Sequence, residues 1–214
     1  MELSRWIGRV VKIVNLQIEI VDDNCTGCYR CERVCPTEAI TMVGPRTEAL
    51  AVVDNDNCIA CFRCIDSCDD DAMFAVPRDE PLEIVPRFDG LDPHDVLELC
   101  RAADLDPDQL ACACSGSPTK ELAAVILGGA TTFEEVALRT GAQSGCLMYC
   151  SVPIRRLLLA QTDTAESTAR VRRYPVDLAL RDVSAEAAAR YPIFNVREEQ
   201  QHRREYLATI DVEL

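Results

Sequence analysis

The sequence predicts an α+β protein with two small cysteine-rich domains and an extended C-terminal arm. One cysteine spacing occurs twice between residues 25 and 68, among short strand-like segments, and four more cysteines between residues 112 and 150 lie among helical segments. We expect five segments: an amphipathic helix over 1–15, a first domain over 16–80, a linker over 81–91, a small all-α domain over 92–160 and a partner-binding tail over 161–214.

The first group of cysteines repeats one spacing. It reads Cys25-x-x-Cys28-x-x-Cys31-x-x-x-Cys35-Pro36 and then Cys58-x-x-Cys61-x-x-Cys64-x-x-x-Cys68. Three thiolates spaced in this way can surround one cubane iron–sulfur cluster, and in proteins with two clusters the fourth cysteine ligates the other cluster. We therefore predict two [4Fe–4S] clusters with crossed ligands: Cys25, Cys28, Cys31 and Cys68 at a first cubane site, and Cys58, Cys61, Cys64 and Cys35 at a second cubane site.

Zinc and disulfide bonds are the alternatives for these cysteines. Zinc sites use pairs of cysteines around one tetrahedral ion, and the two three-plus-one groups fit that pattern poorly. The N-terminus does not look secretory, so we expect the thirteen cysteines to be in a reducing compartment, where they serve mainly as metal ligands. The expected location is the cytoplasm or the cytoplasmic face of a membrane complex.

The chain is strongly acidic, with a formal net charge of −14. Each oxidised cluster with four thiolates adds about −2, so three clusters bring the total to about −20. This charge argues against nucleic acid as a partner and favours redox proteins with basic surfaces. Simple solubility is the alternative explanation of the charge.

The N-terminal residues have the apolar periodicity of a short amphipathic helix with a basic side, carried by Leu3, Trp6, Ile7, Val10, Val11 and Val14 opposite Arg5, Arg9 and Lys12. The helix is too short and too charged to span a bilayer. We expect it to dock on a partner subunit or on the first domain, with contact to a membrane surface as the alternative.

The segments around the cysteine repeat predict strands. Leu16, Ile18 and Ile20 alternate with polar residues, and residues 40–43 and 49–53 flank a Gly44-Pro45 turn. With the cysteine motifs, residues 16 to 80 resemble bacterial-type two-cluster ferredoxins, which implies a small pseudo-symmetric α+β unit around two cubanes. Aspartates 69–71 follow Cys68 where Pro36 follows Cys35; they either disfavour reduction of the nearby cluster or begin a solvated helix.

Pro77, Pro81 and Pro86 predict a linker, after which Asp92 and Pro93 predict the start of a helix. Cys100 has no cysteine neighbour at ligand spacing, so we expect it to be a buried core residue.

The second group is Cys112-x-Cys114, then a helical hairpin, then Cys146-x-x-x-Cys150. A capping box at Thr132 begins the second helix of the hairpin. Residues 110 to 160 resemble the [2Fe–2S] domain of bacterioferritin-associated ferredoxins, which implies a [2Fe–2S] cluster on Cys112, Cys114, Cys146 and Cys150. That family usually has two residues between its last cysteines and a glycine after the third, so the identity of the fourth ligand stays open, and zinc or an empty site is the alternative.

The sequence contains no dinucleotide loop, haem attachment motif or nucleophile–base pair. We therefore expect a non-catalytic electron-transfer subunit that relays single electrons within a multi-subunit oxidoreductase, as part of a hetero-oligomer. Its partners would be a flavoprotein, a hydrogenase or another catalytic subunit. An iron–sulfur sensor, or a regulatory or iron-store binding module, is the alternative function.

Overall fold

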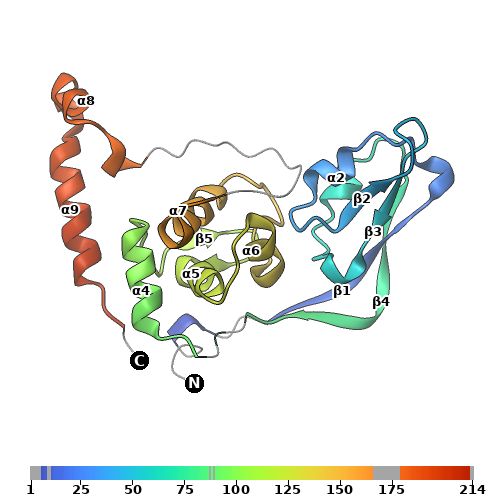
Figure 1. Ribbon diagram of the computed structural model, residues 1–214, viewed down its shortest axis with the longest axis horizontal. Coiled ribbons are helices and arrows are strands. Elements are labelled where there is room, and N and C mark those ends of the chain that lie inside the picture. The colour runs from blue at the N-terminus through green and yellow to red at the C-terminus, as the bar shows by residue number, and fades with distance from the viewer. Residues whose placement is uncertain (1–5, 9–10, 87, 89, 166–178, 213–214) are drawn as a thin grey trace.

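The computed structural model describes residues 6–8, 11–86, 88, 90–165 and 179–212. Figure 1 shows the cysteine-repeat unit on the right, a helical unit in the middle and a helical arm on the left. A long ribbon of two strands runs from the first unit toward the second. The mixed α+β class with a helical C-terminal region is confirmed. In the described part of the chain, no helix is long and apolar enough to cross a membrane.

The cysteine-repeat unit contains two small antiparallel sheets. In the first, β1 (Lys12–Ile20) pairs with β4 (Met73–Ile84). In the second, β2 (Ile40–Val43) pairs with β3 (Leu50–Val53), which confirms the predicted strand, turn and strand. Gly44, in the connecting turn, has a φ of 108°, a conformation that glycine adopts most easily.

The N-terminal helix predicted over 1–15 is wrong from Lys12 onward, because β1 begins at that residue. Lys12 and Val14 pair with Ile84 and Leu82 of β4. The β-branched residues here favour a pleated surface once a partner strand is available. Residues 1–5 and 9–10 lie outside the described residues. Ile7 is buried in the core of the helical unit, so this part of the N-terminus docks on the second domain rather than on the first.

The linker predicted from the prolines, with bounds 81–91, is wrong as far as Ile84, because β4 continues to that residue. Pro77 pairs with Leu16, and the register then shifts before Leu82 pairs with Val14. This irregular stretch contains Pro81. The sheet has only two strands, so β4 tolerates prolines as an edge strand does.

The helical unit forms the larger core. Its elements are α4 (Pro93–Ala102), β5 (Leu110–Cys112), β6 (Ser117–Pro118), α5 (Thr119–Leu127), α6 (Phe133–Thr140) and α7 (Ser151–Thr162). The prediction of an all-α domain is therefore wrong in one respect, because the short strands β5 and β6 pair with each other. Asp92 caps α4 by accepting a hydrogen bond from the His94 N–H, and the predicted capping box of Thr132 with Glu135 is present. Cys100 is fully buried in this core, as predicted.

The described part of the arm folds back on α4. It consists of η3 (Leu180–Asp182), α8 (Ala185–Arg190), η4 (Pro192–Phe194) and α9 (Val196–Thr209). Arg101 of α4 donates to the main-chain oxygen of Leu207 at 3.2 Å, and Arg203 forms an ion pair with Asp104 at 3.1 Å. The arm therefore orders against its own chain, and binding of a partner by the tail stays a prediction.

Candidate iron–sulfur sites

The two cysteine repeats have the same local backbone. A short 3₁₀ helix precedes each first cysteine, η1 (Asp22–Asn24) before Cys25 and η2 (Asn55–Asn57) before Cys58. Tyr29 and Phe62, at equivalent positions, have φ values of 64° and 61° just before α2 (Arg30–Val34) and α3 (Arg63–Asp66). The repeat in the sequence is therefore also a repeat of backbone conformation.

At the first cubane site, four thiols line one cavity, those of Cys25, Cys28, Cys31 and Cys68. Cys28 is exposed and Cys31 is buried. Gly27 lets the cysteine loop closely approach Ala49, the residue before β3: a Cβ at Gly27 would lie 2.6 Å from the Ala49 oxygen, and the φ of Gly27 is 66°. The remaining lining is mostly apolar, which suits a cluster held by thiolates alone.

At the second cubane site, the other four thiols of the repeat line a separate cavity, those of Cys35, Cys58, Cys61 and Cys64. Each cavity thus combines three cysteines of one motif with the fourth of the other. Three of the four thiols are buried. The main-chain N–H of Ala60 donates to Cys58 Sγ at 3.4 Å, the kind of hydrogen bond that stabilises a thiolate ligand.

Burial raises the proton affinity of several thiols at the two cubane sites. It raises the pKa of Cys31 and of Cys61 to about 11, and that of Cys64 to about 12. Such thiols hold their protons at neutral pH unless a cationic iron core replaces them. Cluster assembly therefore has to release protons from this unit.

No three His, Cys, Asp or Glu side chains of the described residues group as ligands of one metal ion. A cubane has a different requirement, because its core stands between the four thiolates and keeps them apart. The two cysteine-lined cavities meet this requirement.

The aspartates after Cys68 tie the two cysteine loops together. Asp69 forms an ion pair with Arg30 of the first loop, and Asp70 accepts a hydrogen bond from Thr26 Oγ1 at 2.7 Å. All three aspartates are exposed. Their charge beside the first cubane site is thus partly balanced by Arg30.

The third site brings together the four cysteines of the helical unit. Cys112 ends β5, and Cys150 stands just before α7; both are buried and share a hydrogen bond. Cys114 and Cys146 are exposed and also share a hydrogen bond. The structure thus places Cys150 with the other three cysteines despite the extra residue in its motif.

Hydrogen bonds prepare two of these thiols to be thiolates. A bond from Cys150 lowers the pKa of Cys112 and raises that of Cys150, so the buried pair shares one proton. The N–H groups of Tyr149 and Met148 lower the pKa of Cys146. Donors aimed at sulfur favour the charged form that a cluster requires.

The Cys114 thiol occupies the space beside Gly145 that a side chain at that position would fill. A Cβ at this position would overlap Cys114 Sγ and would lie 3.0 Å from Cys114 Cβ. This close approach and the four converging cysteines fit a small cluster with two exposed and two buried ligands.

The second cubane site lies against the third site. Arg63, between Phe62 and Cys64, donates a hydrogen bond to the main-chain oxygen of Gly145, the residue before Cys146. A small apolar cluster of Val14, Ile59 and Ile84 packs on Leu138 of α6. The sequence carries no signal for the Arg63 contact, because it joins residues from two independent motifs.

These sites define an iron–sulfur protein with two kinds of cluster. Residues 20–72 match the family model described as 4Fe-4S dicluster domain, and residues 110–160 match that of the BFD-like [2Fe-2S] binding domain. The chain therefore contains a 4Fe-4S dicluster domain followed by a BFD-like [2Fe-2S] binding domain, and it holds two [4Fe–4S] clusters and one [2Fe–2S] cluster. No curated protein and no solved structure matches the chain. Each bound cluster supplies one-electron oxidation and reduction.

Proposed function

We propose that the chain is an electron-transfer subunit that relays single electrons between partner subunits of a cytoplasmic multi-subunit oxidoreductase complex. The order of exposure of its three sites carries this proposal. The first cubane site has exposed Cys28, the [2Fe–2S] site has exposed Cys114 and Cys146, and the second cubane site has mostly buried ligands. A buried cluster site between two more exposed ones suits electrons that enter the chain at one exposed site and leave it at the other.

The contact between the two units supports this order of sites. Arg63 touches Gly145, and its neighbour Cys64 belongs to the second cubane site. Gly145 in turn adjoins Cys146 and contacts Cys114 Sγ. The second cubane site is therefore the one beside the [2Fe–2S] site.

The crossed cysteines connect the two cubane sites. Cys31 and Cys35 are one helical turn apart at α2, yet they line different cavities. Cys64 and Cys68 have the same relation at α3. The second cubane site is thus adjacent both to the first cubane site and to the [2Fe–2S] site, so an electron there could move to either.

The partners would supply the substrate chemistry. The sequence has no dinucleotide loop or nucleophile–base pair, so a flavoprotein, a hydrogenase or another catalytic subunit would have to provide it. The net charge of −14 would steer the chain toward basic surfaces on those partners, with weaker association at high salt.

The test disables the [2Fe–2S] site within the assembled complex. In the double variant Cys112→Ser/Cys114→Ser we expect both [4Fe–4S] signals in electron paramagnetic resonance (EPR) spectra to persist while turnover of the complex falls. Cys100→Ala is the matched control, because it removes a buried cysteine of the same unit that lines none of the three sites.

Assembly has to be measured separately, since a lost metal site can unfold its domain. Size-exclusion chromatography of the complex gives this control. A double variant that assembles normally and keeps full turnover would show that the [2Fe–2S] site is not an obligatory part of the relay.

A further inference from the structure

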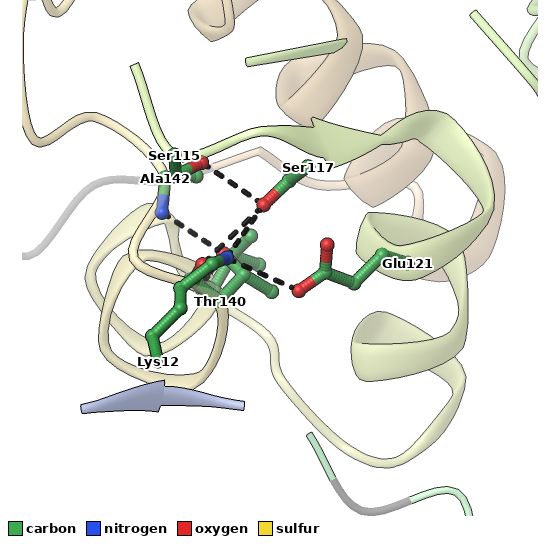
Figure 2. Close-up of polar contacts among 7 residues, drawn as sticks. Lys12, Ser115, Ser117, Glu121, Thr140 and Ala142 are labelled. Atoms are coloured by element: carbon green, nitrogen blue, oxygen red, sulfur yellow. Dashed lines mark hydrogen bonds and ion pairs between the residues drawn. The ribbon is translucent and has the colours of Figure 1, made fainter. Parts of the chain in front are cut away.

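A hydrogen-bond network around Lys12 joins the two units (Figure 2). Lys12 begins β1, and its side chain passes Gly141, where a Cβ would lie 3.1 Å from Lys12 Cδ. Its ammonium group donates to Ser117 Oγ at 2.9 Å and to the main-chain oxygen of Thr140. It also lies 3.3 Å from Glu121 Oε1. A strand of the cysteine-repeat unit therefore places a cation in the helical unit.

The network continues to a cysteine of the [2Fe–2S] site. The hydroxyl oxygens of Ser117 and Ser115 are 2.9 Å apart. After Cys150, the next favourable contributions to the low pKa of Cys112 are hydrogen bonds from the Ser115 side chain and its N–H. Lys12 is thus linked to Cys112 through two serines.

Glu121 is the buried counter-charge of Lys12. Its side chain is 1 % exposed, against 19 % for Lys12, and its Oε2 has no hydrogen-bond partner among the described residues. Burial raises the pKa of Glu121, and the charge of Lys12 opposes that rise. Without Lys12 this carboxylate would be an uncompensated buried charge and would take up a proton.

The charges that act most on Glu121 are Lys12 of β1 and Cys112 of β5. Several titratable groups on the helices packed against α5 have other neighbours. On α4, Cys100 lies near Asp106 and Asp108. On α6, Glu135 accepts a hydrogen bond from Thr131, and Arg139 donates one to Gly128. On α7, Arg156 lines a surface groove with Met148 and Tyr149.

We propose that Lys12 is a positioning residue of the [2Fe–2S] site, supplied by the other unit. It holds the loop of residues 112–117 through Ser117, and it keeps Glu121 ionised in both oxidation states. The cluster then exchanges its electron without a proton while the two units are docked. This inference rests on the proposed function only in placing the [2Fe–2S] cluster on these cysteines.

The test measures the midpoint potential of the [2Fe–2S] cluster in the full chain by EPR-monitored redox titration, from mildly acidic to mildly alkaline pH. The wild type and Lys12→Arg should have flat profiles. In Lys12→Met, reduction adds negative charge and raises the proton affinity of Glu121, so the potential should fall as pH rises. The steepest slope of potential against pH is about 59 mV per pH unit, because a tenfold change in an equilibrium constant corresponds to about 59 mV for a one-electron couple.

The double variant Lys12→Met/Glu121→Gln should be flat again, because the titrating carboxyl is gone. Glu121→Gln alone should raise the potential, since it removes a negative charge and keeps the cation. Lys120→Met is the matched control, because Lys120 lies next to Glu121 on α5. Lys120 is about as buried as Lys12 but pairs with Asp108, so its loss should leave the profile flat.

A flat profile in Lys12→Met, or a slope that persists in the double variant, would overturn the proposal. If Lys12→Met loses its cluster, retention in the double variant supports an uncompensated Glu121 as the cause, and loss in both variants leaves only a structural role and refutes the electrostatic one. The titration is an equilibrium measurement on the isolated chain, so it is independent of turnover. Absence of a [2Fe–2S] signal in the wild type would instead refute the cluster assignment.

Discussion

Substitution of Gly145 by alanine tests the geometry of the [2Fe–2S] site directly. The added Cβ would overlap Cys114 Sγ and approach Cys114 Cβ to 3.0 Å, so the thiol or the loop has to move. Gly145 does not have a positive φ, so alanine should meet little backbone strain there. The expected cost is that of overpacking, about 1–3 kcal/mol of the free energy of unfolding.

Gly129→Ala is the matched control, because it imposes strain without a clash. Gly129 has a φ of 94°, and apart from its chain neighbours no described residue has an atom within 4 Å of the point where a Cβ would stand. Left-handed backbone costs a residue with a Cβ about 1–2 kcal/mol, so the two variants should lose similar stability. Only Gly145→Ala should displace a cysteine of the third site.

The assay combines denaturant unfolding with the visible and EPR spectra of anaerobically purified protein. For Gly145→Ala we expect a perturbed or missing [2Fe–2S] signal with both [4Fe–4S] signals retained, and for Gly129→Ala we expect all three signals. A wild-type [2Fe–2S] spectrum in Gly145→Ala would refute the inference that Cys114 is a ligand in this position.

Two further predictions concern the clusters themselves. Iron and sulfide analysis should give about ten irons per chain, from four, four and two; stoichiometric zinc with little iron would contradict this. Cys35→Ser should perturb the cluster at Cys58, Cys61 and Cys64, because of the crossed ligands. A change in EPR spectra confined to the cluster at Cys25 would reverse the assignment of the fourth cysteines.

The sequence predicted those elements whose signals are local. The cysteine loops depend on spacing, α4 on a cap at Asp92, and α6 on the capping box at Thr132, and each signal lies within a few residues of the structure it specifies. The strands around Gly44 were predicted for the same reason. Assignment of each fourth cysteine to the other cluster stays a prediction, to which the two cavities give geometric support.

The errors arose where distant partners override local preference. Residues after Lys12 have helical periodicity, but β4 lies beside them and makes them a strand. Prolines 77 and 81 indicate a linker, yet an edge strand with a register shift accommodates both. In that irregular stretch Arg78 donates to Leu16 O at 3.1 Å and to Cys58 O at 3.2 Å, so it braces the second cysteine loop.

Two cations of the cysteine-repeat unit reach the helical unit, Lys12 from β1 and Arg63 from α3. Lys12 reaches Ser117 and Glu121, and Arg63 reaches Gly145 beside Cys146. Separation of the two units would break both contacts together. The second cubane site would then lose its neighbour, and Glu121 would lose its counter-charge. The distance between clusters and the charge beside the [2Fe–2S] cluster are therefore coupled through a single interface, so a partner that shifts this interface would change both.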